Sequence, residues 1–298
     1  MGIDFIALDW GTTSCRAYRA SAEGAVIETV SAAEGILAVR DGDFEAALER
    51  VIGNWDTSLP VLAAGMITSR QGWMELPYVA CPAGAEDLAA SLRHHRTGRG
   101  RQVAFSTGLS YRAADGIPDV MRGEEAQVLG AAEEGVVHFV TPGTHSKWIA
   151  MENDKIVRFT TYITGEVFAA LSNHTILGRL MKEGPQDDAA FRRGVKSALG
   201  DPAGFLHRVF SARSLGLLGE MPPEHIASYL SGQVIGTEVA HAQASYPPDA
   251  SYVVLASPAI GGRYVKAMEV AGLRARLGDP AAIVRGLALI AHEAGLIA

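Results

Sequence analysis

An internal repeat of strand, Gly-Thr turn and strand constrains the fold of this chain more than any other feature. The first copy contains Gly11-Thr12 and Ser14, and the second contains Gly143-Thr144 and Ser146, each 132 positions later. In both copies a polar corner and a third apolar strand follow the second strand. The repeat predicts two related lobes, each opening with an antiparallel meander.

The segment after the first copy has the pattern of an α/β lobe. Apolar residues recur at helical spacing behind Asp43, which is placed to cap a helix, and an apolar strand and further elements follow. We expect strands over 3–8, 14–20, 25–30, 60–65 and 102–105, helices over 44–55, 86–95 and 124–134, and a loop over 110–118. This order predicts a mixed sheet covered by helices.

The second half of the chain is mainly helical after its meander. We expect strands over 137–140, 147–151, 155–162 and 252–256, and helices over 167–182, 187–199, 203–213, 223–244, 263–270 and 281–296. The sequence leaves open which lobe holds the last helix. A length of 298 residues suits two lobes, 1–134 and 135–298.

Composition excludes several classes of partner and location. The net charge of −7 gives no electrostatic basis for binding nucleic acid or anionic membranes. The one basic cluster, at 93–101, is expected at a solvated helix end and loop, with His94-His95 on a solvated face. Cys15 and Cys81 lack zinc-ligand spacing, the histidines are scattered, and neither a leader peptide nor a membrane span is recognisable. We therefore expect a cytoplasmic protein without a structural metal or membrane partner.

The two Gly-Thr turns suit phosphate binding. Glycine lets the backbone approach phosphate oxygens, and neighbouring amides and Thr hydroxyls supply donors. Gly11, Thr12 and Thr13 form the first candidate set, while Gly143 and Thr144 form the second. Asp9 would repel phosphate unless Mg²⁺, bound through water, stood between them. Two ordinary hairpins remain the alternative.

The familiar nucleotide fingerprints are missing. The chain contains no GxxxxGK[ST] sequence, and no GxGxxG sequence follows the first strand. Gly261-Gly262 follows a late strand instead, where it suits either a turn against adenosine or a simple helix entry.

Motifs along nearly the whole chain carry a family resemblance. They are Asp9-Trp10-Gly11-Thr12, Ala64-Gly65-Met66, Gly72-Trp73, Met121-Arg122-Gly123-Glu124-Glu125, Pro142-Gly143-Thr144-His145, Lys147-Trp148, Thr164-Gly165-Glu166 and Asn173-His174. The chain resembles the sugar kinase and actin superfamily and, within it, the 2-keto-3-deoxygalactonate kinases, also called 2-dehydro-3-deoxygalactonokinases. The resemblance implies two actin-like (ribonuclease H-like) lobes with the active site in the cleft between them.

The resemblance also implies the reaction. An ATP- and Mg²⁺-dependent enzyme would phosphorylate 2-dehydro-3-deoxy-D-galactonate on its terminal hydroxyl, O6, in galactonate catabolism. The adenosine segment departs from the superfamily, because Ala256-Ser257-Pro258 stands where Gly and a small hydroxylated residue are usual. Ser257 and Gly261 remain the adenosine candidates, and His145 and Lys147 join the phosphate candidates.

Glu124 is the candidate catalytic base. It opens a helix just before the second turn, and this placement is similar to the Gly-Asp-Gln helix start of glycerol kinase relatives, whose aspartate is the base. Glu125 is the second choice. Acidic residues in a first helical turn are also common as plain helix caps.

A sugar acid needs cationic or N–H donors for its carboxylate. Arg16, Arg70 and Arg122 lie in or beside the motifs and are the cationic candidates. By resemblance, the sugar contacts also include Gly65, Met66, Ser69, Trp73 and Glu166, and Tyr78 is a further candidate. The aromatic residues suit core packing equally well.

Three other functions stay open from the sequence. They are a kinase for another sugar or sugar acid such as 2-dehydro-3-deoxygluconate, a phosphatase of the same fold, and a noncatalytic nucleotide-binding protein. The oligomeric state is also open, and a homodimer is compatible with the sequence.

Overall fold

The computed structural model describes residues 4–132 and 137–298, and the chain divides into two compact units. Unit 1 contains the described residues of Met1–Val137 together with Ile149–Phe159 and Asp279–Ala298. Unit 2 contains His138–Trp148 and Thr160–Gly278. The predicted lobe boundary between 134 and 135 lies outside the described residues, as do the predicted strand start at Ile3 and helix end at Glu134.

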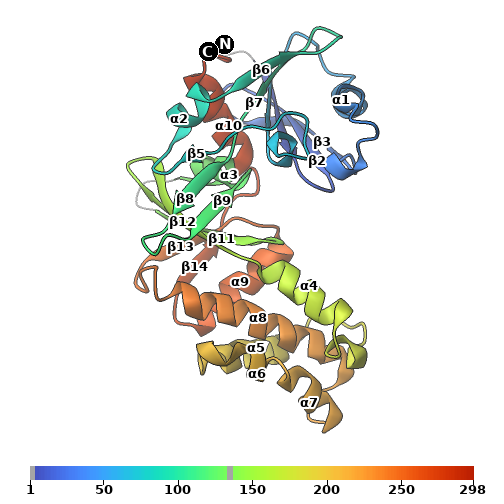
Figure 1. The fold of residues 1–298 in the computed structure, drawn as a ribbon, viewed down its shortest axis with the longest axis vertical. Helices are drawn as coiled ribbons and strands as arrows, with labels where there is room; N and C mark the ends of the chain where they lie inside the picture. Colours follow the sequence, from blue (N-terminus) through green and yellow to red (C-terminus); the bar gives the residue numbers. More distant parts are fainter. Residues whose placement is uncertain (1–3, 133–136) are drawn as a thin grey trace. The chain divides into compact units, whose positions relative to one another are not determined.

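A six-stranded mixed sheet forms the centre of unit 1 (Figure 1). Its order is β3 (Val26–Ala32), β2 (Cys15–Ala20), β1 (Phe5–Trp10), β4 (Val61–Ala64), β7 (Gln102–Phe105) and β6 (Arg93–Arg96). The meander β1–β2–β3 is antiparallel, whereas β4 runs parallel to β1 with Asp9 opposite Ala64. The carboxyl ends of β1 and β4 therefore meet at one edge, which is the usual place for ligand contacts in such sheets.

Helix α1 (Phe44–Ile52) covers this sheet with an apolar face. Asp43 caps the helix by accepting a hydrogen bond from the Ala46 amide at 3.0 Å. Phe44, Leu48 and Trp10 belong to one buried apolar cluster. Burial of such side chains supplies most of the stability of a lobe of this kind.

The rest of unit 1 pairs a small sheet with helices from both ends of the chain. The elements are β5 (Val79–Ala80), β8 (Leu109–Arg112), β9 (Pro118–Met121), α2 (Ala85–Ala90), α3 (Glu124–Ala131) and α10 (Ala282–Glu293). Helices α3 and α10 lie side by side (Figure 1). A Cβ atom on Gly130 would lie 1.8 Å from the Ala282 carbonyl oxygen, and one on Gly286 would lie 1.8 Å from that of Ala126. Glycine at both positions therefore allows the backbones to touch.

Unit 2 is built on the second copy of the repeat. The five-stranded sheet has the order β12 (Lys155–Tyr162), β11 (Ser146–Glu152), β10 (His138–Thr141), β13 (Ser251–Val254) and β14 (Arg274–Leu277). Strands β10, β13 and β14 are parallel, and the unit division passes through β11 and β12. The second predicted meander is thus present, and its strands β11 and β12 are divided between the two units.

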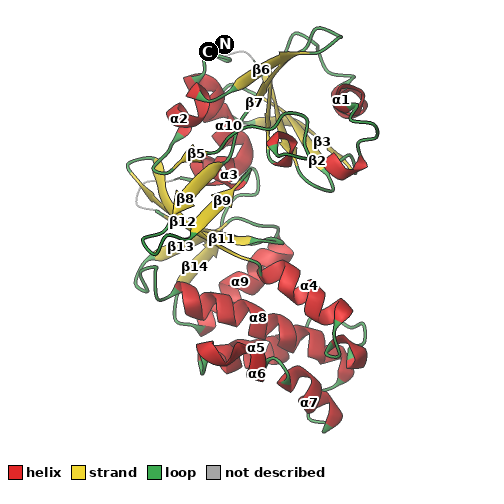
Figure 2. Ribbon diagram, viewed as in Figure 1, coloured by secondary structure: helices red, strands yellow, loops and turns green. Residues whose placement is uncertain are grey.

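Helices make up most of unit 2 (Figure 2). They are α4 (Thr164–His174), α5 (Asp188–Leu199), α6 (Phe205–Arg208), α7 (Ser211–Leu217), α8 (Ile226–Ala242) and α9 (Pro258–Val270). Short 3-10 turns complete the chain at η1 (Ile36–Ala38), η2 (Met66–Thr68), η3 (Gly178–Leu180), η4 (Pro202–Gly204) and η5 (Pro223–His225). Helix α8 is buried almost all round, as expected of a central helix.

Several sequence predictions about local structure were wrong. The helix predicted over 167–182 ends at His174, and the one predicted over 203–213 is divided into α6 and α7. The helix predicted to reach residue 95 ends at Ala90, and Arg93–Arg96 form the edge strand β6. The loop predicted over 110–118 is shorter, because residues 110–112 belong to β8 and Pro118 begins β9, which pairs with it. Strand β14 was not predicted, and α9 begins at Pro258 instead of residue 263.

The basic cluster is not a solvated helix end. Arg101 is fully buried, and its guanidinium donates hydrogen bonds to the carbonyls of Ile52, Trp55 and Asp56 and to Glu49. The Ile52 carbonyl belongs to the last residue of α1, and the carbonyls of Trp55 and Asp56 follow the helix. The last carbonyls of a helix have no partner within the helix. Among residues 4–132 and 137–298, no helix is long and apolar enough to span a membrane.

Candidate active site

The first Gly-Thr turn follows β1 in unit 1 and is held by the chain that follows β3. The Gly11 amide donates to the Ser14 carbonyl at 2.9 Å, which closes the turn. The amides of Ile36 and Leu37 donate to the carbonyls of Gly11 and Thr12. Thr12 and Thr13 remain exposed. A braced turn with outward hydroxyls is an arrangement that can meet an oxyanion.

Asp9 lies beside this turn in an acidic environment. It pairs across the sheet with Arg16, and the two side chains form an ion pair of 3.7 Å. Burial raises the pKa of Asp9, Arg16 lowers it, and the nearby Glu124 carboxylate raises it again. Two carboxylates and one guanidinium therefore share this edge of unit 1.

Two glycines bring the start of α3 against the ends of β1 and β4. Gly65 has φ of 91° and Gly123 has φ of 109°, both in the region that other residues rarely adopt. A Cβ atom on Gly65 would lie 3.0 Å from the Trp10 carbonyl oxygen, and one on Gly123 would lie 3.4 Å from the Gly65 Cα. The close approach places Glu124, the first residue of α3, next to Asp9.

The two acidic residues that open α3 have different environments. Glu124 is half-buried, and its carboxylate accepts a hydrogen bond from the Arg122 amide at 3.1 Å. Glu125 is fully buried, and both of its carboxyl oxygens lie within 2.8 Å of the Gly123 amide. Burial, with the Glu124 charge beside it, raises the pKa of Glu125 to about 8. Glu124 is thus the more accessible of the two carboxyl groups, while Glu125 holds the Gly123 amide at the start of α3.

Glu125→Gln is expected to flatten the pH dependence of stability. Between pH 4.5 and 8 the folded chain holds a proton on Glu125 that the unfolded chain has lost, so stability falls as pH rises. The neutral variant lacks this loss. The free energy of unfolding of the variant minus that of the wild type should therefore increase by roughly 3 kcal/mol from pH 5.5 to pH 8.5. Urea unfolding at both pH values measures this gain, and an equal difference at both would contradict a neutral Glu125.

The loop after β4 is clamped by Arg122. Its guanidinium donates to the Thr68 hydroxyl at 2.6 Å and to the Leu76 carbonyl at 3.1 Å, and it lies 4.3 Å above the Tyr78 ring centre. Thr68 also bonds to the Gly65 carbonyl. Arg122, which lies two residues before Glu124, therefore fixes the loop after β4 beside Asp9 and Glu124.

The other sequence-predicted sugar contacts in unit 1 divide into exposed and packed residues. Arg70 is exposed, Met66 is half-buried, and the Ser69 hydroxyl donates to the Met66 carbonyl. Trp73 packs against Phe105, with ring centres 5.2 Å apart, and belongs to the sheet core. Its observed role is packing.

The second Gly-Thr turn meets the start of α4 in unit 2. A Cβ atom on Gly165 would lie 2.4 Å from the Gly143 carbonyl oxygen, and the Glu166 amide donates to the Thr144 carbonyl. His145 Nε2 lies 2.8 Å from the Glu166 carboxylate. Lys147 is buried, and its ammonium donates to the His145 carbonyl. The turn is thus fixed from both sides.

A small cavity of about 60 Å³ adjoins this turn. Its lining comes from the turn, α4, α8 and α9, namely Gly143, Thr164, Gly165, Phe168, Ser231, Val234, Ile235, Ile260, Arg263 and Tyr264. Ser257 precedes α9 and is exposed, whereas Gly261 is buried in α9 against Leu277. Ile260 and Arg263, which sequence reasoning missed, line the cavity from the same helix.

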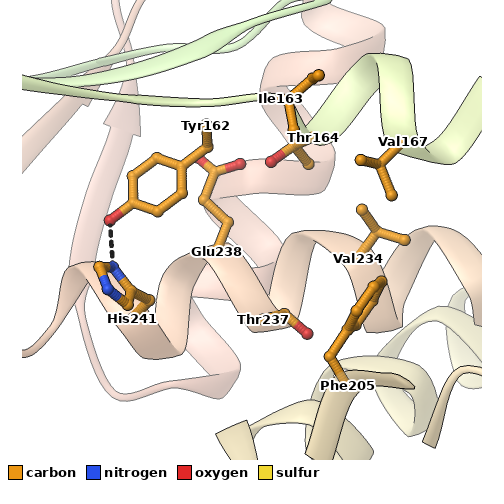
Figure 3. A pocket seen from close by; sticks show the side chains of 9 residues that line it. All are labelled: Tyr162, Ile163, Thr164, Val167, Phe205, Val234, Thr237, Glu238 and His241. Atoms are coloured by element: carbon orange, nitrogen blue, oxygen red, sulfur yellow. Dashed lines mark hydrogen bonds between the residues drawn. The ribbon is translucent and has the colours of Figure 1, made fainter. Parts of the chain in front are cut away.

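A larger and mainly apolar cavity of about 280 Å³ lies between α4, α6 and α8 (Figure 3). Tyr162 and His241 close one side through a 2.8 Å hydrogen bond between the phenol and Nδ1. Glu238 and Thr164 extend toward each other at another side. None of the sequence-predicted site residues lines this cavity.

Together the fold and the turns define a sugar kinase of the actin-like α/β class. The chain belongs to the 2-keto-3-deoxy-galactonokinase family, whose model matches residues 9–290. This confirms the resemblance found in the sequence. The probable 2-dehydro-3-deoxygalactonokinase DgoK1 of Rhizobium meliloti is 34% identical, with 94% of each chain covered. The 2-dehydro-3-deoxygalactonokinase of Escherichia coli is 32% identical, with 97% of each covered.

Solved structures agree on the fold. A Sinorhizobium meliloti protein named for the same activity has a TM-score of 0.89 and 32% identity, with 97% of this chain and 98% of that chain covered. Component A of (R)-2-hydroxyglutaryl-CoA dehydratase from Acidaminococcus fermentans has a TM-score of 0.53 and 12% identity, with 96% of each covered. The second likeness concerns the fold alone.

The predicted site residues are divided between the two units. Unit 1 holds Asp9, Gly11, Thr12, Thr13, Arg16, Gly65, Met66, Ser69, Arg70, Trp73, Arg122 and Glu124. Unit 2 holds Gly143, Thr144, His145, Lys147, Glu166, Ser257 and Gly261. Glu166 was predicted as a sugar contact, and the structure places it on His145 and on the second turn.

Proposed function

We propose that the chain transfers the terminal phosphate of ATP to 2-dehydro-3-deoxy-D-galactonate, giving the 6-phosphate in galactonate catabolism. The support is family membership over residues 9–290. The observation that carries the mechanism is Glu124, a reachable carboxylate held next to Asp9 at the end of β1. Such a carboxylate can receive the proton of an attacking hydroxyl.

In this proposal unit 1 binds the sugar acid. Glu124 would orient the acceptor hydroxyl and take its proton as the O–P bond forms. Arg16 and the exposed Arg70 would attract the sugar carboxylate, while Arg122 would hold the loop that carries Ser69. Met66 and Gly65 would complete the floor of the pocket at the end of β4.

Mg²⁺ would accompany the nucleotide, and the residues of the first turn fit it. The donors at this edge are carboxylate and hydroxyl oxygens, which Mg²⁺ prefers. The raised pKa of Asp9 reflects burial and the neighbouring Glu124 charge, both of which a cation would relieve. Asp9 would hold the ion through water, beside Gly11, Thr12 and Thr13. Mg²⁺ would neutralise phosphate charge during transfer.

Unit 2 would bind the remainder of ATP. Gly143 and Thr144 would donate to phosphate oxygens, with His145 and Lys147 close behind them. Ile260 and Arg263 line the cavity beside the turn and are better placed for adenosine than the buried Gly261. Ser257, the N-cap residue of α9, would contact the adenosine at the rim of this cavity.

A coupled ADP-release assay over a panel of sugar acids tests this function. We expect turnover with 2-dehydro-3-deoxygalactonate, weaker turnover with its gluconate epimer, and loss of both when EDTA removes Mg²⁺. ADP release without any sugar acid would favour the phosphatase alternative. Nucleotide binding without turnover on every sugar acid would favour the noncatalytic alternative.

We also propose a cytoplasmic location for the enzyme. The support is the state of Cys15 and Cys81, which are both unpaired thiols, together with the use of ATP. A reducing compartment preserves such thiols.

A further inference from the structure

Glu238 is a buried carboxylate at the centre of unit 2 that the proposed reaction does not use. It lies on α8 and is 3% exposed. Its Oε1 accepts hydrogen bonds from the Ser146 hydroxyl at 2.7 Å and from the Trp148 indole at 2.8 Å. Its Oε2 accepts one from the Tyr264 hydroxyl at 2.7 Å. The Thr164 hydroxyl also lies close enough to lower the pKa of Glu238.

These three donors and Thr164 come from three separate elements. Ser146 and Trp148 are on β11, Thr164 is the first residue of α4, and Tyr264 is on α9. Figure 3 shows Glu238 reaching from α8 toward Thr164. One carboxylate therefore joins four elements of the unit.

The same elements carry the candidate nucleotide residues. Ser146 directly follows the turn of Gly143 and Thr144, and Thr164 precedes Gly165, which packs on that turn. Tyr264 lines the small cavity together with Gly143 and Arg263. Glu238 lines the larger cavity instead, and it reaches the candidate nucleotide residues through these partners.

The carboxyl group is costly to bury, and its surroundings supply several donors. The pKa of Glu238 is raised, because burial outweighs the hydrogen-bonding groups that lower it. The Trp148 indole can only donate, so Oε1 must accept in every protonation state. An apolar residue of similar size would avoid the cost of burial but would leave the donors unpaired.

We propose that Glu238 is a positioning residue of the nucleotide site, which fixes the second Gly-Thr turn relative to α4 and α9. The proposal rests on the function proposed above. It assigns a role to a residue that touches neither substrate. A positioning role predicts a selective effect on nucleotide binding, whereas a purely structural role predicts a loss of stability alone.

The test compares Glu238→Gln with the wild type. Glutamine keeps the shape and one oxygen for Ser146 and Trp148, and it turns an amide toward Tyr264. We expect the Kd for ADP, measured by calorimetry, and the KM for ATP to rise about tenfold, because the amide that faces Tyr264 can no longer accept its hydrogen bond. The KM for the sugar acid should change less than about twofold.

Gln233→Leu is the matched control on the same helix. Gln233 is buried and bonds to Ser211 and to the Arg208 carbonyl, away from the turn. This variant should lose stability with an unchanged Kd for ADP. Ser146→Ala removes one donor from Glu238 and should raise the Kd for ADP about threefold. This variant replaces Glu238→Gln in the test if Glu238→Gln does not fold.

Three outcomes would overturn the proposal. They are an unchanged Kd for ADP in folded Glu238→Gln or Ser146→Ala, an equal rise in both KM values, and an equal rise in Kd for Gln233→Leu. A wild type that binds ADP but phosphorylates no sugar acid would refute the proposed function, while the Kd comparison would still decide the role of Glu238. A wild type that binds no ADP would refute both.

Discussion

Glu124→Gln is expected to fold like the wild type and to lose about three orders of magnitude in kcat, the usual contribution of a general base. The amide keeps the size of the side chain and can still accept the hydrogen bond from the Arg122 amide. It cannot take a proton from the acceptor hydroxyl. Turnover measured at saturating ATP and sugar acid, with unfolding curves for both proteins, checks this expectation.

Glu125→Gln is the matched control for this experiment. Its carboxyl is the neighbouring one on α3, but it is buried on the Gly123 amide. We expect its kcat to stay within about threefold of the wild type. A near-normal kcat for Glu124→Gln together with a large loss for Glu125→Gln would transfer the role of base to Glu125.

Gly286→Ala is expected to destabilise unit 1 by about 3 kcal/mol, the upper end of the usual cost of overpacking. The added methyl would lie 1.8 Å from the Ala126 carbonyl oxygen, a distance that forces α3 and α10 apart. Intrinsic helix propensity alone predicts the opposite sign, a gain of about 1 kcal/mol. Thermal unfolding should show Tm lowered by roughly 6–12 °C.

Gly262→Ala provides the matched control for helical glycine. Gly262 lies within α9, and nothing is within 4 Å of the position of an added Cβ. Its Tm should stay level or rise slightly. Equal effects at Gly262 and Gly286 would show that contact between α3 and α10 does not decide stability.

The repeat allowed much of the fold to be predicted, including the two turns that carry candidate site residues. Both meanders, the two Gly-Thr turns and the position of Glu124 at a helix start are local features, and glycine, hydroxyl and acid patterns report them directly. Lys155–Tyr162 was predicted with both ends correct. Local chemistry determines such elements before tertiary contacts are considered.

Edge strands and buried charges were harder to predict. Arg93–Arg96 has the composition of a solvated helix end, yet it forms β6 because its backbone pairs with β7. Charged side chains are common on the edge strand of a sheet. His95 lies over Trp73 and bonds to Glu45, so it is only partly solvated. Arg101 is buried because it satisfies carbonyls that no sequence pattern reveals.

The polar network of unit 2 could not be predicted for a related reason. Ser146 and Trp148 lie 92 and 90 positions from Glu238, and Tyr264 lies 26 positions from it. Periodicity over a window of one helix carries no information on such pairs. Glu238 is the one Asp, Glu, Lys or Arg residue of α8, and this was the signal that the sequence offered.

The pairing of α3 with α10 has a consequence for synthesis of the protein. The helix that starts with Glu124 packs on α10, which leaves the ribosome only after the whole of unit 2. Unit 1 therefore cannot complete its packing before unit 2 has been made, although its first strands emerge early. A stop codon at Asp279, which removes α10 and spares every proposed ligand contact, should still yield an inactive and protease-sensitive product.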